Sequence, residues 1–143
     1  MSGTEDDGCV REIIELAGRL HARTHAHYEA KVAETGLTMP QARALMLLSA
    51  EQAMSMRALS DLLGANPSNV TITMDRLQAR GLVERDEHVG DRRVRAVRLS
   101  REGAALKRRL QEGLLAGNPT ATRLSTAEQK TLRDLLRRLV HEE

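Results

Sequence analysis

NPSNVTITMDRLQARGLVERDEHVGDRRVRAVRLS, residues 66–100, is the stretch that decides the fold of this 143-residue chain. Its first half predicts a helix. Asn66 is a favourable N-cap, Pro67 suits the first helical position because its missing N–H costs nothing there, and Gly81 ends the pattern. Polar residues follow one side of this helix and apolar residues the other, so one face is free to touch a partner.

The second half of the stretch predicts a hairpin. Residues 82–88 and 94–99 have the composition of strands, and Gly90 and Asp91 make the turn between them. Five arginines and no acid lie from Arg92 to Arg101, so the hairpin is strongly basic at its tip. A helix that can enter a major groove, followed by an arginine-tipped hairpin that can reach a minor groove, is the layout of a winged helix-turn-helix. It indicates double-stranded DNA as the partner.

A shorter helix precedes the quoted stretch. Ser55 is an N-cap for residues 56–63, and Gly64 stops that helix. Two short helices separated by three residues around a glycine are the signature of a helix-turn-helix. Further upstream, Thr38 and Gln41 stand at capping-box spacing and open another helix. That helix is expected to bury Ala42, Leu45, Met46 and Leu48, and a brief extended piece is expected around Ala53 and Met54.

Helices flank this central region on both sides. After a small, acidic and frayed start over residues 1–8, apolar residues recur at spacings of three and four from Val10 to Glu34. Ser100 caps a helix over residues 101–115, a break follows at GNPTAT, and Ser125 with Glu128 opens the last helix. The terminal helices are too apolar on one face to stand alone, so they must pack on each other or on a second chain. The residues on these faces are Val10, Ile13, Ile14, Ala17, Leu20, Thr24 and Tyr28 in the first helix, and Leu132, Leu135, Leu136, Leu139 and Val140 in the last.

The composition describes a protein with an aliphatic core, since Tyr28 is the only aromatic residue. A length of 143 residues fits one domain, or two lobes that share a core. The net charge of +2 is too small to indicate nucleic acid by itself. Of 22 basic residues, only Lys31, Lys107 and Lys130 are lysines. A GC-rich coding sequence explains this overall arginine excess as well as function does, but it does not explain the cluster at the hairpin tip.

The sequence shows no signal peptide and no apolar run long enough to span a bilayer. Cys9 is the only cysteine, which excludes an intramolecular disulfide. We therefore expect a soluble, cytoplasmic protein without membrane partners, associated with the nucleoid when it is bound to DNA. No motif indicates a cofactor.

Residues 37–103 resemble the MarR family of bacterial transcription regulators. The matching segments are LTMPQARALMLL, ALSDLLG, PSNVTITMDRLQARGLVER and GDRRVRAVRLSREG, and the flanking helices fit as well. The resemblance implies a homodimer whose N- and C-terminal helices interlock and whose two winged lobes bind a pseudo-palindromic operator. We thus expect a mainly α fold with a small β wing. Residues 1–35 and 101–143 would form the helical dimerisation base, and residues 36–100 the DNA-binding lobe.

Two groups of residues are predicted to carry DNA binding. Asn pairs bidentately with adenine, Ser and Thr contact bases or phosphates, an isoleucine touches a thymine methyl, and arginine suits a phosphate. The predicted residues of the recognition helix are Ser68, Asn69, Thr71, Ile72, Thr73 and Arg76, and those of the wing are Asp91, Arg92, Arg93 and Arg95. The resemblance places a D-x-R wing motif on Asp91 and Arg93, in which the arginine enters the minor groove and the aspartate orients it. The alternatives are an ordinary polar helix face and, for Arg92, Arg95 and Arg98, solvated arginines.

The resemblance also implies a ligand-responsive repressor, controlled by a small anionic or aromatic effector bound between the lobe and the helical base. No residue identifies the effector. His21 and His25 share a helix face and are candidate ligand residues, and His27 lies close by. A metal site, a ligand cavity, a dimer seam and plain packing are the alternatives for the three histidines.

Cys9 is a candidate redox sensor, because it lies near the start of the first helix, where a thiolate can be stabilised. Asp6 and Asp7 oppose that role by their charge, and an inert cysteine is the alternative.

Functions of other classes lack support in the sequence. There is no phosphate-cradling glycine loop, no G-x-S-x-G and no zinc-protease motif, so an enzyme is not expected. A winged helix that binds protein or RNA is the serious rival. Duplex RNA hides its major groove from a recognition helix, and a protein-binding winged helix would not need the arginine tip.

Overall fold

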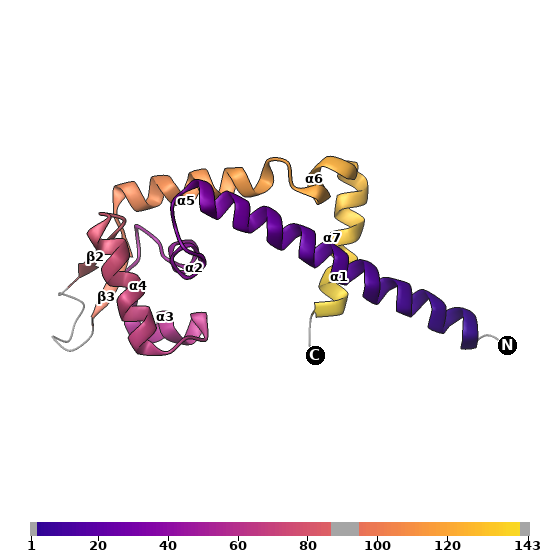
Figure 1. The fold of residues 1–143 in the computed structure, drawn as a ribbon, viewed down its shortest axis with the longest axis horizontal. Helices are drawn as coiled ribbons and strands as arrows, with labels where there is room; N and C mark the ends of the chain where they lie inside the picture. The colour runs from indigo at the N-terminus through magenta and orange to yellow at the C-terminus, as the bar shows by residue number, and fades with distance from the viewer. Residues whose placement is uncertain (1–2, 87–94, 141–143) are drawn as a thin grey trace. The chain divides into compact units, whose positions relative to one another are not determined.

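The computed structural model describes residues 3–86 and 95–140 (Figure 1). The elements are α1 (Gly3–Glu34), α2 (Met39–Leu47), β1 (Met54–Ser55), α3 (Met56–Leu63), α4 (Pro67–Ala79), β2 (Val83–Asp86), β3 (Ala96–Leu99), α5 (Arg101–Leu115), α6 (Pro119–Arg123) and α7 (Thr126–Val140). The predicted class, mainly α with a small β sheet, is confirmed. The predicted recognition helix is α4, and the predicted hairpin strands are β2 and β3.

The chain divides into two compact units. Residues 31–112 form one unit, which we call the winged lobe, and residues 1–30 with 113–143 form the other, which we call the terminal-helix unit. Helices α1 and α5 each begin in one unit and end in the other. None of the helices within the described residues has the length and apolar character that crossing a bilayer requires.

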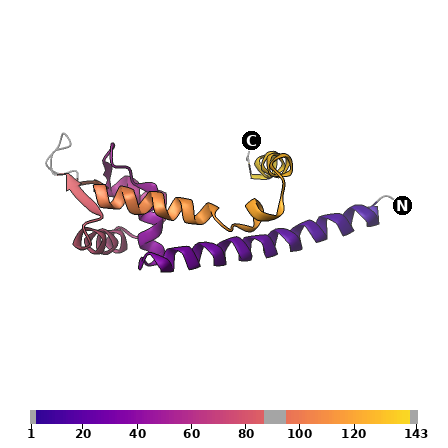
Figure 2. The ribbon, with the colours of Figure 1, turned by 90° about the horizontal axis from the view of Figure 1, so that it is seen from above.

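In the winged lobe, three antiparallel strands form a sheet in the order β1-β3-β2. Strands β2 and β3 lie beside α4 (Figures 1 and 2). Val83 pairs with Leu99 across β2 and β3, and Met54 pairs with Val97 across β1 and β3. The extended piece expected near Met54 is thus an edge strand of the wing sheet. Because β1 leads directly into α3, the sheet and the helix-turn-helix are built as one body.

The helix starts of the lobe follow the predicted caps. Thr38 and Gln41 form a reciprocal capping box, in which the Thr38 N–H donates to Gln41 Oε1 at 2.9 Å. The Ser55 hydroxyl accepts from the Ala58 N–H at 3.1 Å, and Asn66 Oδ1 accepts from the Ser68 N–H at 2.9 Å. These side chains satisfy amides that have no partner within their own helices, which fixes where α2, α3 and α4 begin.

Aliphatic side chains fill the core of the lobe, as the composition predicts. Leu45 and Leu48 come from α2 and the residue after it, Leu59 from α3, and Met74 and Leu77 from α4, and all five are fully buried. Val32, Val70, Val97 and Leu110 complete the set of largest buried side chains. Met46, expected inside, is only half-buried.

Gly103 lies where α5 crosses the start of β2. A Cβ atom at this position would stand 1.9 Å from the carbonyl oxygen of Leu82 and 2.9 Å from its carbonyl carbon. The same oxygen accepts from the Ser100 N–H at 3.1 Å, while the Ser100 hydroxyl donates to the Gly81 carbonyl at 2.5 Å and accepts from the Gly103 N–H at 3.0 Å. Ser100 therefore caps α5 as predicted and also ties it to the end of α4, and only a glycine permits this approach.

Two helix boundaries differ from the sequence prediction. Helix α1 begins at Gly3, not after the frayed stretch expected over residues 1–8. Acidic residues in this stretch of sequence favour a helix start, because they complement the positive end of the helix dipole. The break expected at GNPTAT contains the short helix α6, which Asn118 opens by accepting the Thr120 N–H at 3.0 Å. An Asn-Pro pair is an N-cap followed by a favourable first helical residue, the same signal that starts α4.

The terminal-helix unit exposes apolar side chains that the single chain leaves uncovered. On α1, Ile14 is 68% exposed, and on α7 both Leu139 and Val140 are 76% exposed. Val10, Ile13, Leu16, Leu115, Leu135 and Leu136 are exposed as well. None of the described residues of α7 is buried. The single chain therefore does not provide the cover that these helix faces need in water.

Candidate nucleic-acid interface

Helix α4 presents a polar face to solvent and an apolar face to the lobe. Ser68, Asn69, Ile72 and Arg76 are exposed, whereas Val70, Met74 and Leu77 are buried against the core. Because residues three and four apart share a helix face, Asn69, Ile72 and Arg76 line up along the exposed side. The structure thus places these predicted residues together on one accessible surface.

The two threonines of this helix are half-buried and use their hydroxyl hydrogens internally. Thr71 donates to the Pro67 carbonyl at 3.0 Å, and Thr73 donates to the Asn69 carbonyl at 2.9 Å. A hydroxyl that has given its hydrogen away still accepts, and its methyl group still makes apolar contact. The threonines are therefore suited to an amino donor or a methyl group on a base edge, and Asn69 remains the side chain with both a donor and an acceptor to offer.

Ile72 supplies the apolar part of this surface. It is 49% exposed although α4 buries other aliphatic residues completely. A single exposed apolar side chain is normal on a protein surface, and at this place it is available to an apolar group of a partner. The C5 methyl group of thymine is such a partner in a major groove.

An ion pair that the sequence did not reveal joins α4 to the wing. The Asp75 carboxylate on α4 accepts from Arg85 Nη2 on β2. The two residues are ten positions apart in different elements, and no periodicity links them. The pair neutralises the Asp75 carboxylate on the exposed side of α4. It also connects β2 to the middle of that helix.

The wing arginines have different surroundings. Arg98 Nε lies 3.3 Å from Glu84 Oε2 across the β2–β3 pairing, so its charge is partly matched within the sheet. Arg95 is exposed, and its carbonyl accepts from the Met56 N–H at 3.0 Å. The predicted tip residues Asp91, Arg92 and Arg93 lie outside the described residues.

The three histidines of α1 lie in different environments. The His21 and His25 rings are stacked with centroids 5.9 Å apart, and His25 Nε2 lies 3.4 Å from Glu29 Oε1. His27 Nε2 instead donates to the Leu114 carbonyl at 3.2 Å, within the terminal-helix unit. Within residues 3–86 and 95–140, no three His, Cys, Asp or Glu side chains are grouped to hold a metal ion. The geometry favours packing for His27 and leaves His21 and His25 as exposed candidates.

Cys9 is exposed and free. Helix α1 begins at Gly3, so Cys9 lies in its second turn rather than at its terminus. Because the stabilising effect of helix amides falls off within the first turn, the start of α1 stabilises a group at Cys9 less than one at the terminus, and the redox role of Cys9 stays a prediction.

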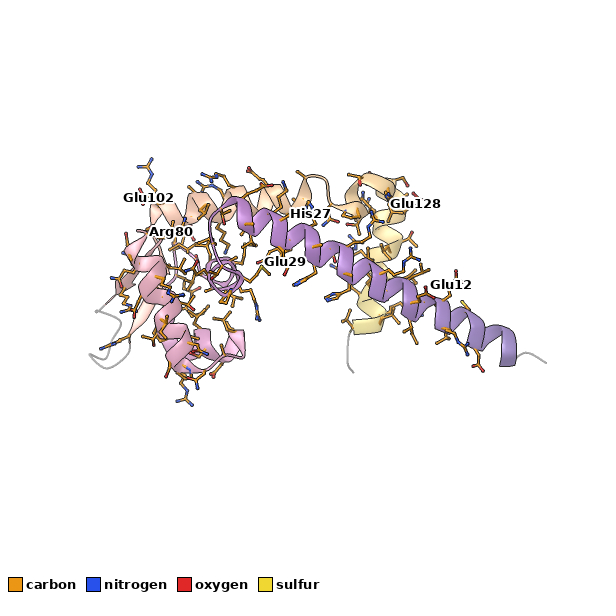
Figure 3. All side chains as sticks on the ribbon, in the orientation of Figure 1. Glu12, His27, Glu29, Arg80, Glu102 and Glu128 are labelled. Atoms are coloured by element: carbon orange, nitrogen blue, oxygen red, sulfur yellow. The ribbon has the colours of Figure 1, made fainter. Side chains whose placement is uncertain are left out.

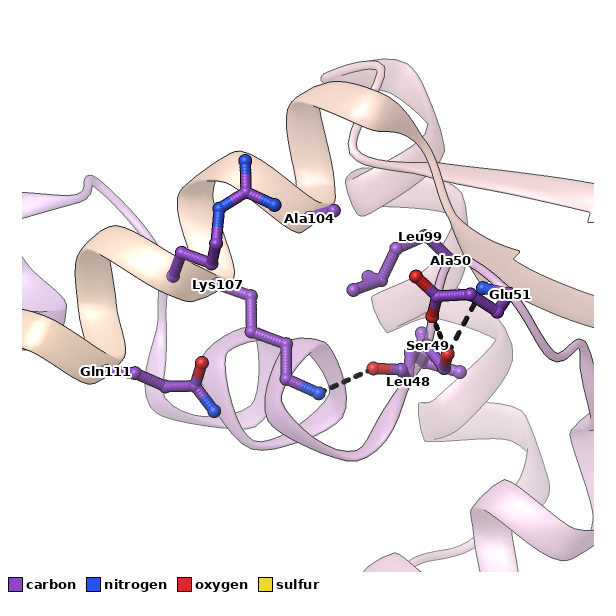
Figure 4. Close-up of a pocket in the computed structure, with 9 residues that line it drawn as sticks. Leu48, Ser49, Ala50, Glu51, Leu99, Ala104, Lys107 and Gln111 are labelled. Atoms are coloured by element: carbon purple, nitrogen blue, oxygen red, sulfur yellow. Dashed lines mark hydrogen bonds between the residues drawn. The ribbon is translucent and has the colours of Figure 1, made fainter.

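A small pocket lies within the winged lobe, between the connection from α2 to β1, β3 and α5 (Figure 4). Lys107 Nζ donates to the Leu48 carbonyl at 2.7 Å at its edge. The Ser49 hydroxyl donates to Glu51 Oε2 at 2.6 Å and lowers the pKa of Glu51, so this residue is a carboxylate at neutral pH. The volume of about 180 Å³ is below the roughly 300–1,000 Å³ of ordinary ligand pockets, and we assign no effector to it.

Comparison with known proteins agrees with this geometry. The model of the MarR family matches residues 37–94, which contain the helix-turn-helix and the first part of the wing. The HTH-type transcriptional regulator YfiV of Bacillus subtilis (strain 168) is 34% identical over 76 residues, 53% of this chain. That match covers 48% of YfiV, so the chain spans about half the length of this curated relative.

Solved structures show the same fold over nearly the whole chain. The reduced form of MarR from E. coli superposes with a TM-score of 0.74 at 21% identity, over 89% of this chain and 95% of that one. A transcriptional regulator of the MarR family from Silicibacter pomeroyi gives a TM-score of 0.65 at 28% identity, over 90% of both chains. The chain therefore has the winged helix-turn-helix fold of these structures, and its residues 37–94 match the model of the MarR family.

Proposed function

We propose that this protein binds a pseudo-palindromic operator in double-stranded DNA, sequence-specifically and as a homodimer, and that it acts as a ligand-responsive repressor. The observation that carries the proposal is the exposed α4 face, on which Asn69, Ile72 and Arg76 lie in line on a helix-turn-helix. Asn69 reads a base pair, Ile72 covers a thymine methyl, and Arg76 contacts a phosphate. Ser68, Thr71 and Thr73 complete the α4 contacts, and Asp91, Arg92, Arg93 and Arg95 those of the wing.

The direct test is a fluorescence-anisotropy titration with three nucleic acids. We expect tight binding to the duplex upstream of the protein's own gene. Binding to random DNA and to the matched RNA should be much weaker. The affinity for the upstream duplex should fall steeply with salt, because bound arginines release counterions from the phosphates. Equal affinity for all three would contradict an operator-binding regulator and favour an interaction module.

Substitution of Asn69 separates base reading from phosphate binding. Asn69→Ala should weaken operator binding by about 1–3 kcal/mol and relax the preference at one base pair of each half-site, because the bidentate contact is lost. Affinities for operators substituted one position at a time measure the preference. Gln78→Ala, at an exposed position near the C-terminal end of α4, is the matched control and should leave the base preference intact. A uniform loss over all sequences would assign Asn69 to the backbone instead.

The wing is tested by Arg93. Arg93→Ala should weaken operator binding by about 1–3 kcal/mol and lower the dependence of affinity on salt, since one cation leaves the DNA. The matched control is Arg98→Ala on the same hairpin, because Arg98 already lies beside Glu84. Fluorescence-anisotropy titrations at several salt concentrations measure the operator affinity and its dependence on salt. If Arg98→Ala costs as much as Arg93→Ala, the assignment of the minor-groove contact to Arg93 is wrong.

The exposed apolar faces of α1 and α7 support the dimer. A second copy supplies the same apolar faces by symmetry, so each chain covers the residues that the other leaves in water. An effector would act on this dimer by binding more tightly to a lobe spacing that does not fit one turn of DNA.

A further inference from the structure

The end of α4 is fixed by its own backbone. Arg80 is the C-cap with φ −85° and ψ 0°, and Gly81 follows with φ +70°. The Gly81 N–H donates to the Gln78 carbonyl at 2.9 Å, and the Leu82 N–H donates to the Leu77 carbonyl at 3.0 Å. This pair of bonds is a Schellman motif, which ends a helix in one defined conformation. The backbone conformation at Arg80, and with it the starting point of the Arg80 side chain, is therefore fixed.

The Arg80 guanidinium lies at the C-terminal end of α1 (Figure 3). Its Nη1 donates to the Gly36 carbonyl at 3.0 Å, and its Nη2 donates to the Thr35 carbonyl at 3.1 Å. The two acceptors follow the last helical residue of α1, Glu34, where the chain turns at Gly36 with φ +69°. Thr35 directly follows the last helical residue, and the negative end of the helix dipole favours a cation beside it.

Arginine suits this contact better than lysine does. The guanidinium is planar and holds two N–H donors at a fixed separation, which matches two successive carbonyls. A lysine ammonium is a single point on a flexible stem. The contact therefore constrains direction as well as distance between the ends of α1 and α4.

We propose that Arg80 is a positioning residue for DNA reading: it latches the end of the recognition helix to the end of α1 and so fixes the direction in which α4 points. The inference rests on the proposed function. The buried residues Val70, Met74 and Leu77 hold α4 against the core along one side, and the bond from Ser100 to Gly81 ties its end to α5. The latch adds a two-point contact between the C-terminal end of α4 and the end of α1. Helix α1 continues without interruption to the segment that carries Ile13 and Ile14, which the proposed dimer covers.

The test compares three variants on one operator series. Arg80→Ala removes the latch, Arg80→Lys keeps the charge without the two-point contact, and Arg76→Ala removes a proposed phosphate contact from the same helix. Affinity is measured by anisotropy for the wild-type operator, and for operators with one base pair inserted or deleted between the half-sites, each at several salt concentrations. Circular dichroism and light scattering confirm that each variant folds and associates as the wild type does.

For Arg80→Ala we expect about a tenfold loss of affinity for the wild-type operator, as two hydrogen bonds that hold the reading geometry are lost. The preference for wild-type half-site spacing should shrink, while the slope of affinity against salt stays unchanged. Arg80→Lys should recover only part of the loss. Arg76→Ala should instead keep the spacing preference and reduce the salt slope by about one.

Three results would overturn the latch. An Arg80→Ala variant with wild-type affinity and spacing preference would show that α4 needs no such support. A reduced salt slope in Arg80→Ala, restored by Arg80→Lys, would make Arg80 a phosphate contact. If the wild-type protein does not prefer its operator over random DNA, both the proposed function and the role of Arg80 in DNA reading are refuted. The first two results leave operator binding intact.

Discussion

Gly103→Ala should destabilise the winged lobe by about 3 kcal/mol or more, because the new methyl group meets backbone and not a side chain that can move aside. The added Cβ would stand 1.9 Å from the Leu82 carbonyl oxygen. To relieve that clash, α5 must move away from the start of β2, which breaks the bonds of Ser100 to Gly81 and Gly103. Since a domain of this size has a total stability of about 5–15 kcal/mol, the change removes a large part of it.

Thermal and urea unfolding followed by circular dichroism measure this effect. We expect the unfolding temperature of Gly103→Ala to fall by roughly 10 °C, together with a loss of soluble protein. The control is Gly18→Ala, because a Cβ at Gly18 meets no atom within 4 Å in this chain. Gly18 lies in the exposed middle of α1, where alanine is the better helix former by about 0.5–1 kcal/mol. Equal unfolding temperatures for the two variants would mean that α5 and β2 are not packed as closely as described.

The double substitution Ile14→Glu with Leu139→Glu should dissociate the proposed dimer and, through it, lower operator affinity more than a hundredfold. The two side chains are 68% and 76% exposed in the single chain, and each contributes about 1.5–3 kcal/mol when a second copy buries it. A carboxylate in their place must stay in water, and four such groups would meet in one symmetric interface. A monomer holds one lobe, so it reads one half-site only.

Light scattering gives the mass of the particle, and anisotropy gives the operator affinity. The winged lobe has its own buried core, so its helical signal should survive the double substitution. Leu62→Glu is the control for mass, since Leu62 is an apolar residue of α3, 59% exposed, in the winged lobe and not in the terminal-helix unit. It should leave the mass unchanged. A variant with both glutamates that keeps the mass of a dimer would place the interface elsewhere.

Local signals in the sequence predicted most of the fold, because a helix start is decided by a few neighbouring residues. Thr38, Ser55 and Asn66 cap helices in the structure as they were expected to. The same signal at Asn118 opens α6, although the surrounding glycine and proline predict a break there. The periodicity of α4 also predicts which of its faces is exposed, because the opposite face is continuously apolar.

Contacts between distant elements could not be predicted in this way. The spacing between Asp75 and Arg85, or between Arg80 and Gly36, follows no helical or strand period, so no sequence pattern pairs them. The same holds for Gly103, which in the sequence is an ordinary glycine near a helix start. The sequence leaves Arg98 as a solvated arginine or a phosphate contact, and only the strand register places it opposite Glu84.

The sequence by itself determined the order of the elements, their caps, the two faces of α4 and the basic hairpin that follows it, because these properties depend on residues close together in the chain. Only the tertiary structure decided how the elements are held. It placed Arg80 on the end of α1, Arg85 on Asp75, and the Gly103 backbone against Leu82. Such contacts depend on the three-dimensional course of the backbone, which brings together residues that no local rule connects.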